Sequence, residues 1–183
     1  ALRETRTPHT DMPRADPTIG PTYPDSTRVS YALGWVAYDH RGKTVVAHGG
    51  VADGFRAQVT LLPDDGVGFA LLNNLHQTKM NVALGNKLID HLCGLPAKDW
   101  DAYFLKVEAD EATAKRDALA ARDRARRADV PPSAAVERFA GEYEDAAYGV
   151  GTVTADGGRL TWAWGSWRCP LEHYQGDQFR VTD

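Results

Sequence analysis

The segment YALGWVAYDHRGKTVVAHGGVADGFRAQVTLLPDDGVGFALLNN, residues 31–74, decides the fold class of this protein. Its runs are filled by aromatic, β-branched and alternating apolar residues, and turns rich in Gly, Asp and Pro separate them. Strands are predicted at 31–39, 44–48, 55–62 and 67–74. Because the connections between them are short, these strands are expected to form an antiparallel meander.

Two of these strands differ in how they are expected to be covered. Strand 55–62 alternates between apolar and polar residues, which is typical of a strand buried on one face. The apolar positions are Phe55, Ala57, Val59 and Leu61, and the polar positions are Arg56, Gln58 and Thr60. Strand 67–74 is apolar on both faces, which predicts a central strand covered on both sides.

Two helices are predicted after the strands. The first covers 78–93, is ended by Gly94 and Pro96, and is expected to lay one apolar stripe on the sheet. That stripe consists of Met80, Leu84, Leu88 and Leu92, flanked by Ala83 and Ile89. The second helix, 104–128, has dense charges of both signs and a thin apolar stripe, so it is expected to be an exposed connection.

The character of the chain changes on both sides of this central region. Residues 1–30 contain five prolines, so they are expected to form a surface segment without long regular elements. VPPS at 130–133 ends the second helix, and short strands with Gly-rich turns follow it. We therefore predict an α+β protein with an antiparallel sheet and packed helix in 1–98 and a linker helix in 99–130. Residues 131–183 are expected to form a small, incomplete, all-β barrel-like module.

Composition argues against several classes of function. The 183 residues carry a net charge of −4, with 43% apolar and 25% charged residues, and such a chain has no electrostatic preference for nucleic acid. No apolar run reaches the ~20 residues that a membrane span requires. The two cysteines are too few for a disulfide framework or a metal site. A Gly-rich phosphate loop is also absent, so no metal and no cofactor are expected.

The serines lack the neighbours of a known nucleophile motif. Lys is absent three residues after each of the four serines, Ser26, Ser30, Ser133 and Ser166, and no Tyr or Ser has Asn two residues later. There is no G-x-S-x-G elbow and no H-E-x-x-H motif. The stretch that stands out chemically is HGGVADGF, residues 48–55, where one histidine is followed by three glycines.

Several features agree in order and spacing with one family. Leu-Gly-Trp at 33–35, His-Gly-Gly at 48–50, Gly-Phe at 54–55 and the strand pair LLPDDGVGFALLNN at 61–74 resemble the C-terminal part of the serine β-lactamase-like hydrolases. This family includes class C β-lactamases, penicillin-binding-protein-like D,D-peptidases, D-aminopeptidases and related esterases. The resemblance covers about residues 28–95 and implies the rear part of a β-lactamase/transpeptidase-like domain.

The resemblance implies roles for four consecutive residues. His48, Gly49 and Gly50 take the place of the family's Lys-Thr-Gly or His-x-Gly triad, which lies on a strand beside the active site. His48 is then implied to contact the substrate and tune a proton network, while Gly49 and Gly50 let the substrate backbone approach. The backbone N–H of Val51 is implied to be an oxyanion-hole donor. The family's Ser-x-x-Lys and Tyr-x-Asn motifs are implied to lie upstream, in an N-terminal half of the same protein.

The implied function is that of a fragment of a serine hydrolase. It would act through an acyl-enzyme on amide or ester bonds of D-amino-acid peptides, small esters or β-lactams, and would supply the cleft strand but not the nucleophile. The resemblance also favours a periplasmic or secreted location. The alternative is a catalytically inactive binding or scaffold module of the same family.

The C-terminal residues resemble the lipocalin-like β module that follows many of these hydrolases. The resemblance begins with FAGEYEDAAYGVGTVTADGGRLTWAW, residues 139–164. Trp162, Trp164 and Trp167 have a spacing typical of residues that line a barrel core, which is favoured over a sugar-stacking platform. A self-contained lipocalin-type carrier would need a closed barrel, and about fifty residues predict one that stays open.

Overall fold

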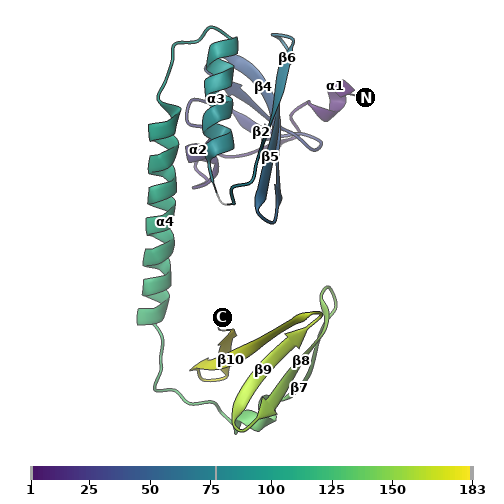
Figure 1. The fold of residues 1–183 in the computed structure, drawn as a ribbon, viewed down its shortest axis with the longest axis vertical. Helices are drawn as coiled ribbons and strands as arrows, with labels where there is room; N and C mark the ends of the chain where they lie inside the picture. The colour runs from purple at the N-terminus through teal and green to yellow at the C-terminus, as the bar shows by residue number, and fades with distance from the viewer. Residues whose placement is uncertain (1, 77, 182–183) are drawn as a thin grey trace. The chain divides into compact units, whose positions relative to one another are not determined.

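The computed structural model describes residues 2–76 and 78–181, which lie in two compact units, Ala1–Ala114 and Lys115–Asp183. Each unit contains its own antiparallel sheet (Figure 1). The architecture is therefore α+β, which confirms the predicted fold class.

The first unit is built on a six-stranded sheet in which the strands follow one another in sequence order. Every pairing is antiparallel, so the sheet is the meander that the turn residues predict. Its strands are β1 (Thr10–Asp11), β2 (Val29–Tyr31), β3 (Val36–His40), β4 (Lys43–Ala52), β5 (Phe55–Leu62) and β6 (Val67–Asn73).

The N-terminal segment contains only short regular elements. Helices α1 (Leu2–Thr5) and α2 (Ile19–Thr22) are short, and β1 and β2 belong to the sheet. The carboxylate of Asp39 accepts hydrogen bonds of 2.8–3.1 Å from the backbone N–H groups of Thr27 and Arg28, which tie the start of β2 to β3. The N-terminal elements are only two to four residues long, and the prolines lie outside both strands.

The sheet packs through a different face from the one that the apolar pattern suggests. On β5, Thr60 and Leu62 are buried, whereas Phe55 and Val59 on the opposite face are 60% and 41% exposed. β6 is an edge strand, so the prediction of a central strand covered on both sides is wrong. The buried face is the one covered by helix α3 (Met80–Leu92) (Figure 1).

Helix α3 approaches the sheet through small and polar residues. A Cβ at Gly85 would lie 3.0 Å from Nε2 of Gln58 on β5, so glycine permits this close approach. The buried positions of α3 are Asn81, Ala83, Gly85, Asn86, Ile89 and Asp90. The predicted stripe therefore marks the wrong face, since Met80, Leu84 and Leu92 are 38%, 40% and 47% exposed.

Helix α4 (Trp100–Arg124) begins as part of the core of the first unit. Its side chains Trp100, Phe104 and Val107 are buried and pack in one cluster with Ala83 of α3. The prediction of a wholly exposed connecting helix is wrong for these turns, because their i, i+4, i+7 spacing places three large side chains on one face. No residue of α4 after Val107 is buried.

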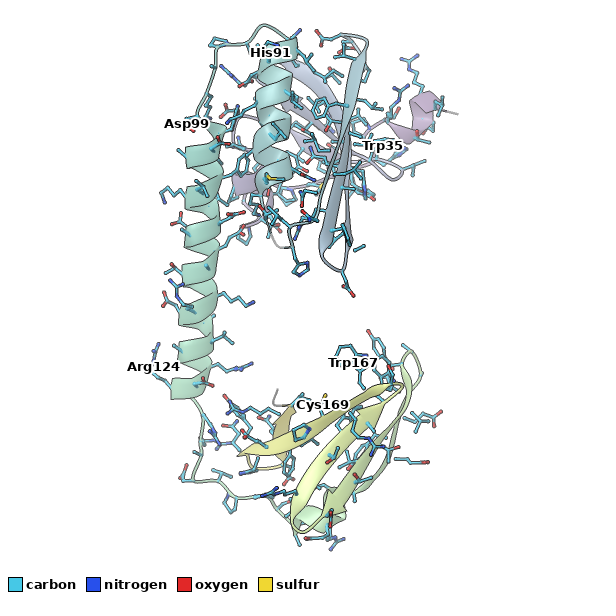
Figure 2. All side chains as sticks on the ribbon, viewed as in Figure 1. Trp35, His91, Asp99, Arg124, Trp167 and Cys169 are labelled. Carbon is cyan, nitrogen blue, oxygen red and sulfur yellow. The ribbon has the colours of Figure 1, made fainter. Side chains whose placement is uncertain are left out.

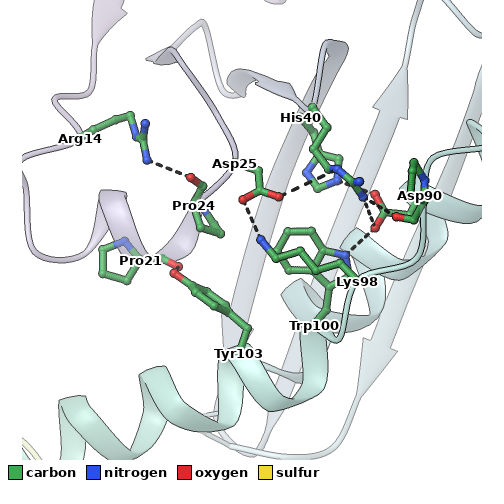
Figure 3. Close-up of polar contacts among 11 residues, drawn as sticks. Arg14, Pro21, Pro24, Asp25, His40, Asp90, Lys98, Trp100 and Tyr103 are labelled. Carbon is green, nitrogen blue, oxygen red and sulfur yellow. Dashed lines mark hydrogen bonds and ion pairs between the residues drawn. The ribbon is translucent and has the colours of Figure 1, made fainter.

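A buried polar network joins the β3–β4 turn to α3 and the start of α4 (Figure 3). Asp90 accepts hydrogen bonds from Nε2 of His40 at 2.9 Å and from Nε1 of Trp100 at 2.7 Å, and it pairs with Nη1 of Arg41 at 2.9 Å. Burial acts to raise the pKa of Asp90. These hydrogen bonds and the attraction to His40 and Arg41 outweigh burial, so the pKa of Asp90 lies below its ordinary value.

The β3–β4 turn has an unusual backbone. Arg41 and Gly42 have φ angles of 52° and 85°, the two positive values of a type I′ hairpin turn. A left-handed conformation costs about 1–2 kcal/mol for a residue with a Cβ. The Arg41 guanidinium is held by Asp90 and by a 2.7 Å hydrogen bond that it donates to the carbonyl of Pro96.

The second unit contains a curled, five-stranded half-barrel sheet in the order β11-β10-β9-β8-β7. Its elements are η1 (Val136–Phe139), β7 (Gly141–Asp145), β8 (Gly149–Asp156), β9 (Arg159–Trp164), β10 (Trp167–Gln175) and β11 (Gln178–Val181). Val153 and Leu160 are its buried apolar residues. The predicted core role is wrong for Trp164 and for Trp167, at the start of β10 (Figure 2), because they are 40% and 67% exposed.

None of the described helices is both long enough and apolar enough to cross a membrane.

Candidate functional site

Strand β4 carries the candidate site on its second half. Val45, Val46 and Ala47 are buried, and every residue from His48 to Ala52 is exposed. β3 pairs with β4 only as far as Ala47, whereas β5 follows β4 to its end. The second half of β4 therefore has a strand on one edge, and no described strand pairs with its other edge.

The hairpin geometry decides which backbone groups lie on that open edge. β4 and β5 are joined by a two-residue turn, and Ala52 pairs with Phe55 across it. A pair that closes a two-residue turn is hydrogen-bonded, and hydrogen-bonded and non-hydrogen-bonded pairs alternate along an antiparallel ladder. It follows that Val51 and Gly49 are non-hydrogen-bonded positions, so their N–H groups point away from β5, toward the open edge.

His48 contacts a tyrosine of the neighbouring hairpin. The hydroxyl of Tyr31 lies 3.4 Å from Nε2 of His48, and the two rings meet edge to face with centroids 6.3 Å apart. Both side chains are exposed. Tyr31 was not among the predicted site residues, because its nearness to His48 depends on the pairing of β2 with β3 and of β3 with β4.

Nothing in the described part of the chain requires glycine at 49 or 50. A Cβ at Gly49 would lie 3.6 Å from the carbonyl oxygen of Ala57, and one at Gly50 would lie 3.7 Å from the Cβ of Ala57. Both distances are ordinary van der Waals contacts, and neither glycine has a positive φ. Gly54, at the hairpin turn, is different because its φ of 80° favours glycine.

A hollow of about 610 Å³ lies at the end of this hairpin. Of the four predicted site residues, Gly50 and Val51 line it, and His48 and Gly49 do not. Its lining residues are Gly50, Val51, Ala52, Phe55, Arg56, Ala57, Leu72, Asn73 and Asn74. The size is sufficient for a small-molecule or peptide group, because ligand pockets span about 300–1,000 Å³.

Arg56 is the one basic residue among those that line this hollow. It pairs in register with Val51, and its Nε is buried without a hydrogen-bond partner among the described residues. A buried donor of this kind normally has a partner. Arg56 was not predicted as a site residue, and its position opposite Val51 on the other side of a short turn is the sequence signal that could have identified it.

Three of the four serines are buried or hydrogen-bonded within the fold. Ser26 and Ser30 are 2% and 0% exposed, and the Ser30 hydroxyl donates to Asp11 at 3.1 Å. The Ser133 hydroxyl donates to Asp177 at 2.8 Å. Within the described ranges no serine hydroxyl bonds to a Lys, Tyr or His side chain, and no group of three or more His, Cys, Asp or Glu is placed to hold a metal.

Comparison with known proteins gives the class of the first unit. Residues 3–93 match the family model described as Beta-lactamase. This part of the chain has a β-lactamase-like serine hydrolase fold and is similar to that family over the matched residues. Residues 125–183 match a second family model, described as a domain of unknown function (DUF3471).

Two fungal proteins are similar in sequence. The Unguisins hydrolase ungD of Aspergillus violaceofuscus (strain CBS 115571) is 31% identical over 182 residues, which cover 88% of this chain and 31% of that protein. The Unguisins hydrolase ungD' of Aspergillus campestris (strain IBT 28561) is 31% identical over 99 residues, which cover 50% of this chain and 18% of that protein. The chain thus spans about a third of the length of the first relative.

A solved structure, that of the octameric penicillin-binding protein homologue from Pyrococcus abyssi, is 16% identical, with a TM-score of 0.43. The likeness covers 93% of this chain and 31% of that chain. The similarity to the family rests on the sequence matches.

Proposed function

We propose that the first unit supplies the substrate-docking strand of a serine hydrolase that acts through an acyl-enzyme. The observation that carries this proposal is the second half of β4, which has an edge without a described partner strand and two glycines that local packing does not require. A substrate backbone lying along that edge would give both features a reason. The nucleophile and its lysine are proposed to come from a segment of the same protein that precedes these residues.

The proposed reaction begins with attack of a serine hydroxyl on an amide or ester carbonyl. A bond forms between the serine oxygen and the carbonyl carbon, the hydroxyl proton passes to a base, and negative charge develops on the carbonyl oxygen. The N–H of Val51 is proposed to donate to that oxygen. The tetrahedral intermediate then collapses and expels the amine or alcohol, which takes the proton back from the base. Water hydrolyses the acyl-enzyme to the free acid.

Two further side chains have proposed roles in substrate binding. His48, with the Tyr31 hydroxyl 3.4 Å from its Nε2, is proposed to bind a polar substrate group near the docking edge. Arg56 is proposed to supply a positive charge to the adjoining hollow, which it lines. A carboxylate would pair well with its guanidinium, because arginine recognises carboxylates through charge-assisted hydrogen bonds. We therefore propose D-amino-acid peptides or β-lactams as substrates ahead of uncharged esters.

The assignment of residue ranges to domains is also a proposal. Residues 1–98 would belong to the catalytic domain, 99–130 to a linker helix and 131–183 to a lipocalin-like β module. The proposed partners are a small-molecule or peptide substrate and the N-terminal half of the same protein.

Covalent labelling tests the proposal. The full-length gene product and residues 1–183 alone are each treated with a fluorophosphonate probe and with a fluorescent penicillin, and the labelled residue is identified by peptide mass spectrometry. We expect one labelled serine in the full-length protein, outside residues 1–183, and no label on the shorter chain.

Steady-state assays with a D-alanine anilide, a nitrophenyl ester and a chromogenic cephalosporin then give the substrate class, and Arg56→Ala is expected to raise KM most for substrates that carry a carboxylate. If the full-length protein is neither labelled nor active, the catalytic proposal is wrong. An inactive binding or scaffold module then becomes the better account of the chain.

A further inference from the structure

The second unit contains a hollow of its own, at the hairpin that joins β7 to β8. Its volume is about 410 Å³, and four of its lining residues are aromatic while two are acidic. The lining residues are Tyr143, Glu144, Asp145, Tyr148, Gly149, Gly151, Trp162 and Trp164. None of them is basic, so the hollow has a negative and aromatic character.

The aromatic walls are held in fixed positions. Nε1 of Trp164 donates a 2.7 Å hydrogen bond to the carbonyl of Tyr148, and the two rings meet edge to face with centroids 6.3 Å apart. The Tyr143 hydroxyl donates to the carbonyl of Phe139 at 2.8 Å. Because these polar groups are already bonded to the backbone, the parts of the rings left for a ligand are their faces and edges.

Gly151 shows that the floor of the hollow is shaped for an indole. A Cβ at this position would lie 1.9 Å from the ring of Trp162, so a larger residue would displace that ring. Gly151 pairs with Tyr143 across β7 and β8. The glycine thus lets the Trp162 ring approach β8 closely at the lining of the hollow.

The two carboxylates differ in their bonding. Asp145 accepts hydrogen bonds from the backbone N–H groups of Ala147 and Tyr148 at 2.8 and 3.1 Å, which fixes it in the hairpin turn. Side chains alternate between the two faces of a strand, so the Glu144 carboxylate lies on the opposite face of β7 from Tyr143 and Asp145. Both bonds to Asp145 end on Oδ1, and no described residue bonds to its Oδ2, so the aromatic rings have one carboxylate oxygen without a partner beside them.

We propose that this hollow binds an organic cation, an alkylammonium or guanidinium group that lies against the aromatic faces with Asp145 at its side. Aromatic faces attract cations through the negative face of the ring quadrupole. Carboxylates add charge complementarity, and they repel the anions that an aromatic site alone would tolerate. The same chemistry could come from a small quaternary ammonium compound or from a Lys or Arg side chain of a peptide.

Binding of a cation and of its neutral isostere tests this assignment. The full chain is titrated with choline and with 3,3-dimethyl-1-butanol, which has the same shape without the charge, and binding is followed by tryptophan fluorescence and by NMR. We expect choline to bind at least about 10-fold more tightly than the alcohol. Equal binding of the two probes, or no binding of either at millimolar concentration, would overturn the proposal.

A second series identifies the source of the cation. The blocked amides of lysine, arginine and norleucine are titrated in the same way. Tighter binding of the lysine or arginine amide than of choline indicates a peptide ligand, and the reverse order indicates a small quaternary ammonium compound. The uncharged norleucine amide is expected to bind at least about 10-fold more weakly than the lysine amide.

Matched variants locate the site. Asp145→Asn is expected to weaken cation binding about 5-fold, whereas Glu144→Gln removes the same charge on the opposite face of the same strand and should leave affinity unchanged. Circular dichroism verifies that both variants are folded. Equal losses in the two variants would show that general charge, and not this hollow, attracts the cation.

Discussion

The two halves of β4 differ in what explains their residues. In the first half, Val45 and Val46 are 0% and 2% exposed and belong to the buried part of the sheet, so packing accounts for their type. In the second half, His48 to Ala52 are exposed, and the glycines there have room for a Cβ. Residues that local packing does not explain are better guides to function than residues that it does explain.

The polar network beneath the first half of β4 is expected to give the largest effect. Asp90→Asn removes the charge that pairs with Arg41 and His40, and breaking a buried pair costs about 3–5 kcal/mol. We expect urea denaturation followed by circular dichroism to show a loss of this size at neutral pH. Activity per folded molecule should not change.

The same network has a pH dependence of known sign. The pKa of Asp90 in the folded protein lies below its ordinary value of 3.8. The carboxylate therefore contributes stability above that value, and the contribution is lost as the pH falls through the folded-state pKa. Urea denaturation repeated between about pH 5 and pH 2 should show a smaller loss in Asp90→Asn than in the unmodified protein. Equal slopes would contradict this role for Asp90.

A substitution at the open edge of the second half of β4 is expected to lower activity without lowering the free energy of unfolding. Val51→Pro removes one N–H that points away from β5, and loss of an oxyanion-hole donor lowers kcat about 100- to 1,000-fold. The measurement is kcat of the full-length protein. Gly50→Pro is the matched control for the backbone, because its N–H lies in the β4–β5 ladder and its loss should lower the free energy of unfolding. If both prolines destabilise equally, the proposed orientation of Val51 is wrong.

The same Val-to-Ala substitution in each half of β4 compares how much the two side chains contribute to the free energy of unfolding. Val45→Ala removes buried methyl groups and should lower the free energy of unfolding by about 2 kcal/mol. Val51→Ala removes the same groups from a side chain that is 61% exposed, and its effect on the free energy of unfolding should be under about 0.5 kcal/mol. Urea denaturation of both variants under the same conditions gives the ratio. Similar losses would mean that the second half of β4 is also buried in the protein.

The meander could be predicted from the sequence because strands and turns depend on local signals. Alternating apolar residues and the turns RGK and PDDG lie within the segments that they organise. The packing face of α3 could not be predicted in this way. Its buried side includes Asn86 and Asp90, whose polarity argues for exposure, and the partners of Asp90 lie at His40 and Trp100, which are 50 and 10 residues away.

The candidate site likewise has a part that could be predicted from the sequence and a part that could not. The sequence places His48 to Val51 at a strand end, and the resemblance to a family assigns them roles that remain predictions. Tyr31 reaches His48 only through the register of three strands, and the unused donor of Arg56 becomes visible only when its surroundings are known. Contacts made across a sheet leave no periodic signal in a single sequence.

The left-handed Arg41 has a consequence for the order of events during synthesis. A β3–β4 turn made alone would bear the cost of that conformation without the contact that offsets it, because the Pro96 carbonyl lies 55 residues further along the chain. The hairpin that begins β4 is thus a poor early nucleus on the ribosome. The strand that carries the candidate site is expected to become stable only after Pro96 has left the exit tunnel and α3 has docked.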